Sequence, residues 1–223
     1  MAIQQTHVVF AVDRAGLVGE DGQTHQGIFD VPYLTSVPNM TVLSPSTHAE
    51  LQTALRQALY DYDGPVAVRY PRGSERDVRG DTFDRSIALL RDGSDITLVS
   101  YGILINEVMR AAALLDAQGV KAEVVKLNCL TDFDWQVLSR SVQKTGRLVV
   151  AEDCAESGCV GEKLIARLAQ DGNLPSFVRL VNLKDRFIPE GKVDQLYQRY
   201  GIDGSAIAAA ALEGFEVERQ KKA

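Results

Sequence analysis

Short apolar runs of strand length recur along the chain and alternate with segments of helical periodicity. The first run, Val8 to Val12, is continuously apolar, as is typical of a strand buried in a parallel sheet. Further strands are predicted at Met40 to Leu43 and at Val66 to Tyr70, and between them Thr47 and Glu50 form a capping box that begins an amphipathic helix. A strand–helix–strand order requires a crossover, so we expect these two strands to be parallel, with the loops that follow them at one sheet edge.

A second alternation of strands and helices follows a charged, weakly periodic stretch, Gly73 to Gly93. Its predicted strands are Ile96 to Ser100, Ala122 to Lys126, Leu148 to Ala151 and Phe177 to Val181, and its predicted helices are Asn106 to Gln118, Asp134 to Gln143 and Val160 to Gln170. This order predicts an α/β chain with a small doubly wound sheet. We expect an incomplete parallel-sheet domain over residues 1–75, a linker over 76–92 and the doubly wound domain over 93–223.

The first of these units has few strands for its apolar pattern. A strand as apolar as Val8 to Val12 needs a neighbour on each side, yet only two more strands are predicted in this unit. We therefore expect the N-terminal part of the sheet to be absent through truncation or to be supplied by another polypeptide.

Composition narrows the classes of partner. The formal net charge is −6, and Lys and Arg are scattered along the chain, which argues against a nucleic acid or an anionic membrane as the main partner. The first residues do not resemble a signal peptide, so we expect a cytoplasmic protein. The cysteines, Cys129, Cys154 and Cys159, lack the paired spacing of a zinc site, and we expect them to be reduced thiols with no metal bound.

The densest group of glycine and polar residues follows the first strand, from Asp13 to Gly27. Within it Arg14, Asp21 and His25 offer a cation, a carboxylate and a titratable imidazole, a combination suited to a phosphorylated carbonyl substrate. Each also has a simpler interpretation: Arg14 as a surface ion pair, Asp21 as a turn residue before Gly22, and His25 as an ordinary hydrogen-bonding side chain.

A second polar group, Arg69 to Gly73, follows the third strand at the same predicted edge. Arg72 lies past the strand end and is our candidate for binding phosphate, because the planar guanidinium donates paired hydrogen bonds to such oxygens. Arg69 lies on the opposite face from Val66 and Val68, where an ordinary ion pair is expected.

Two later features favour structural roles. Gly158 to Lys163 has neither phosphate-binding spacing and is expected to let a helix begin close to the preceding strand. The acidic pair Glu152 and Asp153 is expected to cap that helix.

Several segments resemble those of 1-deoxy-D-xylulose-5-phosphate synthases. The similar segments are Asp13 to Leu34 (DRAGLVGEDGQTHQG with FD and YL after it), Val37 to Ser46 (VPNMTVLSPS), Asp63 to Gly73 (DGPVAVRYPRG), Val150 to Asp153 (VAED) and Asp185 to Gly191 (DRFIPEG). The resemblance implies the second half of a pyrimidine-binding domain followed by a transketolase C-terminal domain. It also implies condensation of pyruvate with glyceraldehyde 3-phosphate, with release of CO2, on thiamine diphosphate and Mg²⁺, in the synthesis of isoprenoid precursors, thiamine and pyridoxal.

The resemblance also implies roles for individual residues. Arg14 and Arg72 match the family's phosphate-binding residues, while His25 and Asp21 match residues beside the reacting groups. It leaves Arg69 structural.

The family's cofactor-binding parts are not found in this sequence. The diphosphate motif G-D-G…N and the glutamate that activates the cofactor have no counterpart, so we expect the chain alone to be inactive and to bind neither thiamine diphosphate nor Mg²⁺. We expect a missing N-terminal part or a partner subunit, and a homodimer; the start, Met1 to Gln5, resembles the end of a family helix and favours truncation. The alternatives are a subunit of another transketolase-like or 2-oxo-acid dehydrogenase-like enzyme, or a non-catalytic dimerisation module.

Overall fold

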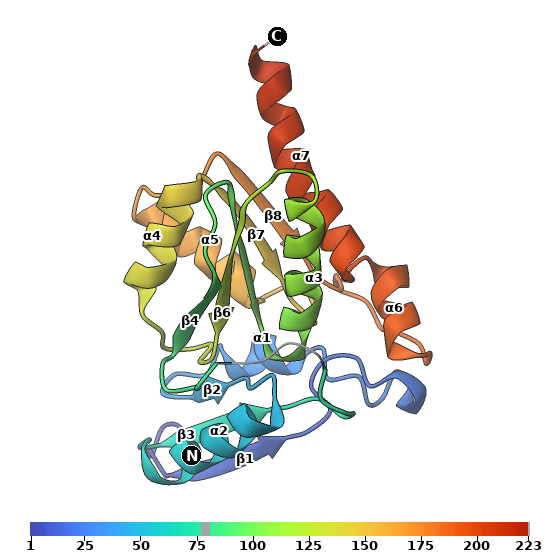
Figure 1. The fold of residues 1–223 in the computed structure, drawn as a ribbon. Coiled ribbons are helices and arrows are strands. Elements are labelled where there is room, and N and C mark those ends of the chain that lie inside the picture. The colour runs from blue at the N-terminus through green and yellow to red at the C-terminus, as the bar shows by residue number, and fades with distance from the viewer. Residues whose placement is uncertain (77–80, 223) are drawn as a thin grey trace.

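Two β-sheets with flanking helices confirm the prediction of an α/β chain (Figure 1). The computed structural model describes residues 1–76 and 81–222, with side chains up to residue 216. We refer to the smaller, lower part of Figure 1 as the N-terminal unit and to the larger part as the C-terminal unit.

The N-terminal unit is built on a parallel three-stranded sheet of order β1-β3-β2. Its strands are β1 (Val8–Val12), β2 (Thr41–Leu43) and β3 (Pro65–Arg69), and its helices are η1 (Gly19–Asp21), α1 (Asp30–Leu34) and α2 (His48–Tyr60). The predicted start of α2 is confirmed, because the Thr47 hydroxyl accepts a hydrogen bond from the Glu50 amide at 3.1 Å.

The strand β1 lies at an edge of this sheet. In the described part of the chain it pairs with β3 alone, and Phe10 is 37% exposed. The expectation of a fully buried first strand is therefore wrong for this chain by itself, because nothing described here covers the outer edge of β1.

The C-terminal unit holds a five-stranded sheet of order β4-β6-β5-β7-β8. Its strands are β4 (Ile87–Arg91), β5 (Ile96–Tyr101), β6 (Ala122–Leu127), β7 (Arg147–Ala151) and β8 (Phe177–Val181). Helices α3 (Ile105–Asp116) and α7 (Gly204–Lys222) cover one face, while α4 (Trp135–Thr145) and α5 (Val160–Gln170) cover the other; η2 (Gly102–Leu104) leads into α3 and α6 (Val193–Tyr200) precedes α7. Helices on both faces of a mainly parallel sheet are the predicted doubly wound arrangement.

The strand β4 lies inside residues 76–92, which were expected to be a linker. It pairs antiparallel with β6 at the edge of the sheet. Ile87 is buried, whereas Leu89 is 52% exposed, so the apolar run at the start of this edge strand is only partly buried.

The two units share buried side chains and buried charges. Val31, Val42 and Ala67 pack in the same apolar cluster as Val125 and other residues of the C-terminal sheet. No described helix is both long and apolar enough to cross a membrane.

An ion pair also crosses between the units, from β6 to α2. The Lys126 ammonium bonds to the Glu50 carboxylate at 2.5 Å, and both side chains are fully buried. Burial raises the pKa of Glu50, but the charge of Lys126 and the hydrogen bonds from Lys126 and Ser46 together hold it below its usual value.

Candidate functional site

The polar loop that follows β1, residues 13–27, is closed by its glycines. The amide of Gly16 donates to the Gly27 carbonyl and the amide of Gly27 donates to the Gly16 carbonyl, each at 2.8 Å. Gly16 has φ of +71°, and a Cβ on Gly27 would lie 2.1 Å from the Arg14 carbonyl oxygen, so both positions require glycine.

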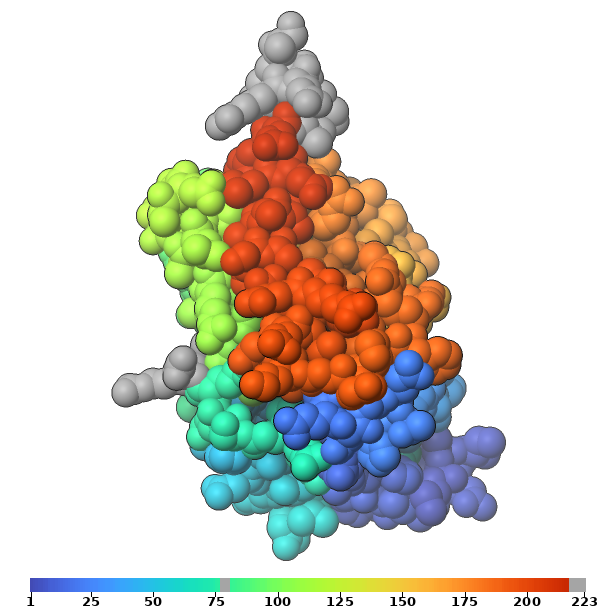
Figure 2. All heavy atoms as spheres, turned by 90° about the vertical axis from the view of Figure 1, so that its right-hand side faces the viewer, coloured from blue at the N-terminus to red at the C-terminus, as the bar shows by residue number. Residues whose placement is uncertain are grey.

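This loop is seated on the C-terminal unit. Leu17 and Ile28 are buried in that unit's apolar core. The Gly191 amide donates to the Gly19 carbonyl at 3.2 Å, and the Gln26 side chain donates to the Pro189 carbonyl at 3.3 Å. In Figure 2 the blue atoms of this region lie directly against the orange atoms of the C-terminal unit. The segment around Pro189 thus serves as a support for the loop.

The structure brings together three of the four predicted site residues, Arg14, Asp21 and Arg72. The Asp21 carboxylate accepts a hydrogen bond from Arg14 Nε at 3.2 Å and another from Arg72 Nη1, both to the same oxygen, Oδ2. These bonds, with Arg72 contributing most and Arg14 next, hold the pKa of Asp21 below its usual value. Asp13 also pairs with Arg14, at 2.5 Å.

The arrangement follows from the sheet. Arg14 follows β1 and Arg72 follows β3, and these parallel neighbours end at the same sheet edge. Two partly exposed guanidinium groups that converge on one carboxylate oxygen form a site suited to a small anion.

His25 lies in the same loop but faces solvent. Its Nδ1 bonds with the Thr24 hydroxyl at 2.9 Å, and no described hydrogen bond or ion pair joins it to Arg14, Asp21 or Arg72. The structure therefore leaves its predicted catalytic role untested.

Arg69 is buried and paired, as the strand alternation suggested. It donates to both oxygens of Asp30, at 2.8 and 3.3 Å, and to Asp153 Oδ1 at 3.2 Å. Its guanidinium also reaches the Gly27 carbonyl at 3.4 Å and lies over the Tyr101 ring. Asp30 was not singled out from the sequence; the only available signal was that an inward-facing arginine needs a carboxylate partner.

The two acidic residues after β7, Glu152 and Asp153, have different roles. The Glu152 carboxylate accepts from the amides of Val160 and Gly161, at 2.9 and 2.8 Å, and so caps α5 as expected. The expectation is wrong for Asp153, which turns to Arg69 instead. Burial raises the pKa of both Glu152 and Asp153.

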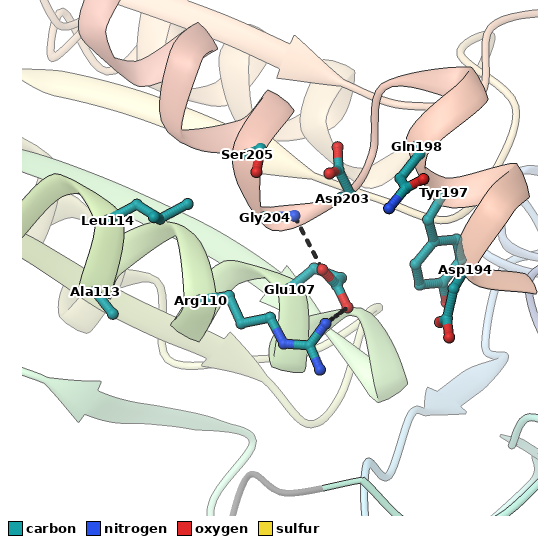
Figure 3. Close-up of a pocket in the computed structure, with 10 residues that line it drawn as sticks. All are labelled: Glu107, Arg110, Ala113, Leu114, Asp194, Tyr197, Gln198, Asp203, Gly204 and Ser205. Atoms are coloured by element: carbon teal, nitrogen blue, oxygen red, sulfur yellow. Dashed lines mark hydrogen bonds and ion pairs between the residues drawn. The ribbon is translucent and has the colours of Figure 1, made fainter.

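A separate cavity of about 500 Å³ lies between α3, α6 and the start of α7 (Figure 3). Glu107 points into the gap between these helices, where it accepts from the Gly204 amide at 2.9 Å and from Arg110 and Arg76, each at 3.1 Å. Because its main polar group is already paired and it shares no lining residue with the loop, this cavity is a weaker candidate than the arginine pair.

The arginine edge does not fit Mg²⁺. Mg²⁺ takes oxygen ligands, but the carboxylate of Asp21 is already held by two cations. Nor do three His, Cys, Asp or Glu side chains in the described part of the chain gather as a metal site requires.

Comparison with known proteins gives two domain matches. The pyrimidine-binding domain of transketolase matches residues 1–77, and the transketolase C-terminal domain matches residues 86–207.

The curated relatives and a solved structure agree with these matches. The chain is 35% identical to a 1-deoxy-D-xylulose-5-phosphate synthase of Heliobacterium modesticaldum, covering 99% of this chain and 35% of that protein, and 39% identical to the synthase of Thermomicrobium roseum, covering 95% and 34%. A solved structure described as "Split gene transketolase, inactive beta4 tetramer" is 28% identical with a TM-score of 0.83, covering 96% of this chain and 68% of that one. The chain spans about a third of the length of these synthases, and it is homologous to their C-terminal third. It belongs to the transketolase family, with part of the pyrimidine-binding domain and the C-terminal domain.

Proposed function

We propose that this chain is the C-terminal part of a thiamine-dependent enzyme of the 1-deoxy-D-xylulose-5-phosphate synthase type. The observation that carries the proposal is the convergence of Arg14 and Arg72 from two adjacent strand ends. Two guanidinium groups in this geometry suit the phosphate of a small acceptor such as glyceraldehyde 3-phosphate. The phosphate takes the place of Asp21 between the arginines when the acceptor binds.

His25 and Asp21 act on the reacting end of that acceptor. His25 is exposed and carries an imidazole, which suits hydrogen bonding or proton transfer at the nascent hydroxyl or at the pyruvate carboxylate. Asp21, once released from the arginines, is a carboxylate in the same loop. Thiamine diphosphate and Mg²⁺ supply the decarboxylation chemistry and are held by another part of the enzyme.

That other part is supplied either by the same polypeptide or by a partner. The share of the relatives that the chain spans and the uncovered edge of β1 both support this assembly. We propose that a further segment pairs with β1 and brings the cofactor site to the arginine edge, in a cytoplasmic homodimer of the complete enzyme.

A chimera tests the function directly. The C-terminal third of the Heliobacterium modesticaldum synthase is replaced by this chain, and CO2 release from pyruvate is measured with and without glyceraldehyde 3-phosphate. We expect turnover that depends on the phosphorylated acceptor. Replacing Arg14 and Arg72 together by Gln should raise KM for glyceraldehyde 3-phosphate by at least about tenfold, because two charge-assisted hydrogen-bonding groups are lost.

Two other results would favour the alternative functions. A chimera that unfolds at the parent's temperature and binds thiamine diphosphate, yet shows no acceptor-dependent turnover, contradicts the proposal and favours a dimerisation module. Turnover with a different acceptor favours another transketolase-like activity. The 223-residue chain alone, given thiamine diphosphate and Mg²⁺, should release no CO2 above background.

A further inference from the structure

We propose that Asp153, in the C-terminal unit, is a positioning residue that fixes where the loop of residues 13–27 packs against that unit. Only the predicted effect on enzyme kinetics rests on the proposed function, because the position of the loop can be measured in the chain by itself. Asp153 is the second residue after β7 and is 1% exposed, while Arg14, Asp21 and Arg72 are partly or largely open to solvent.

Asp153 touches the closure of the loop at the glycine pair. A Cβ on Gly16 would lie 2.2 Å from Asp153 Oδ2 and 2.8 Å from its Cγ, so the carboxyl group fills the space beside the Gly16 α-carbon. The other oxygen, Oδ1, accepts from Arg69, whose second amino group reaches the Gly27 carbonyl at 3.4 Å. The Asp153 carboxyl group thus contacts Gly16 directly and is linked to Gly27 through Arg69.

The surrounding contacts make this seat specific. Asp153 Oδ2 has no hydrogen-bond partner among the described residues, so its position is fixed by packing against Gly16 and by the bond from Arg69 to Oδ1. Two residues later, the Ala155 amide donates to the Ile28 carbonyl at 2.7 Å and holds the chain just beyond the loop. The segment after β7 therefore packs against the residues on either side of the Gly16–Gly27 hydrogen bonds.

The chain offers a matched control in Glu50. Like Asp153 it is a buried carboxylate paired with a buried cation across the two units, but its partner is Lys126 and none of its described contacts involves residues 13–27. Loss of either carboxylate disturbs the junction between the units. Only loss of Asp153 should disturb the loop.

Hydrogen exchange in the full 223-residue chain gives the first readout. In Asp153→Ala, amides of residues 16–27 should exchange about tenfold faster or more, because the closing bonds of Gly16 and Gly27 lose their support. Asp153→Asn keeps the shape and should restore most of the protection. In Glu50→Ala the faster exchange should be confined to α2 and β6. Equal exchange of the loop in the Ala variants of Asp153 and Glu50 overturns the proposal.

Kinetics of the chimera give the second readout. Because misplacement of about 1 Å costs up to about a hundredfold in rate or binding, Asp153→Ala should raise KM for glyceraldehyde 3-phosphate by about tenfold or more. KM for pyruvate should stay within about twofold, and Asp153→Asn should recover most of the loss. An active chimera in which Asp153→Ala and Glu50→Ala have the same KM for the acceptor overturns the positioning role and leaves the proposed function standing. An inactive unmutated chimera contradicts the proposed function, and the exchange comparison then decides the seating of the loop.

Discussion

At the scale of single residues, Asp21 accepts the hydrogen bonds that the proposed phosphate ligand would need. It is the shared acceptor of Arg14 and Arg72, so Asp21→Asn should free both guanidinium groups. Because exposed ion pairs are weak, the gain should be modest, and the variant should bind inorganic phosphate about two- to fivefold more tightly in titration calorimetry.

Asp13 provides the matched control for this measurement. It pairs with Arg14 but has no described contact with Arg72, so Asp13→Asn should tighten phosphate binding less than Asp21→Asn. Weaker binding by Asp21→Asn would show that the carboxylate organises the arginines instead of competing for them.

Both arginines lower the pKa of Asp21. The competition between the Asp21 carboxylate and phosphate should therefore not change with pH above the ordinary aspartate value near 3.8 and should be lost only below it.

At the scale of secondary-structure elements, the pair between α2 and β6 joins the two units. Glu50→Ala leaves the buried Lys126 with Asp81, at 3.6 Å, as its remaining acidic partner among the described residues. The loss should cost about 3 kcal/mol of the free energy of unfolding, the lower end of the range for breaking a buried ion pair. Urea denaturation should show this loss, and the double variant Glu50→Leu with Lys126→Met should recover most of it.

The stability of the fold should also depend on pH through Glu50. The folded-state pKa of Glu50 lies below its unfolded value, so the carboxylate stabilises the fold at pH above that unfolded value. This contribution is lost as pH falls through the folded pKa.

The start of α5 depends on close approach to the sheet. A Cβ on Gly161 would lie 2.5 Å from Leu180 Cδ2 and 2.8 Å from Glu152 Oε2. Gly161→Ala should therefore lower the free energy of unfolding by about 1–3 kcal/mol, as overpacking does. Gly172→Ala probes a glycine with no atom within 4 Å of the added Cβ but a φ of +69°, so it reports the cost of backbone strain alone.

The same elements show how far the sequence leads. Apolar patterning predicted α5 and β8 with the observed bounds. The prediction missed β4, because its short apolar run lies within the charged stretch that was expected to be a linker. It placed Arg14 and Arg72 at one edge, because parallel strands end together. It did not identify Asp30, because its contact with Arg69 spans 39 residues and depends on how α1 packs.

At the scale of the whole molecule, the loop of the N-terminal unit is held by the C-terminal unit. Leu17 and Ile28 are part of the C-terminal core. The Gly191 amide donates to the Gly19 carbonyl, and the Pro189 carbonyl accepts from the Gln26 side chain. An intact C-terminal unit is therefore needed for the geometry of the arginine edge.

At the same scale, the exposed edge of β1 should affect how the isolated chain behaves in solution. The strand is apolar throughout, and its outer edge has no described partner, which makes it a template for pairing with another chain.

The isolated chain should self-associate as its concentration rises, and Phe10→Lys should weaken this association in sedimentation velocity experiments. Phe187→Lys is the control, because Phe187 is 72% exposed but lies after β8, on the C-terminal unit. In the chimera a segment of the synthase should cover β1, so there Phe10→Lys should instead lower the stability of the assembled enzyme. Equal association of the two lysine variants of the isolated chain would show that another surface drives it.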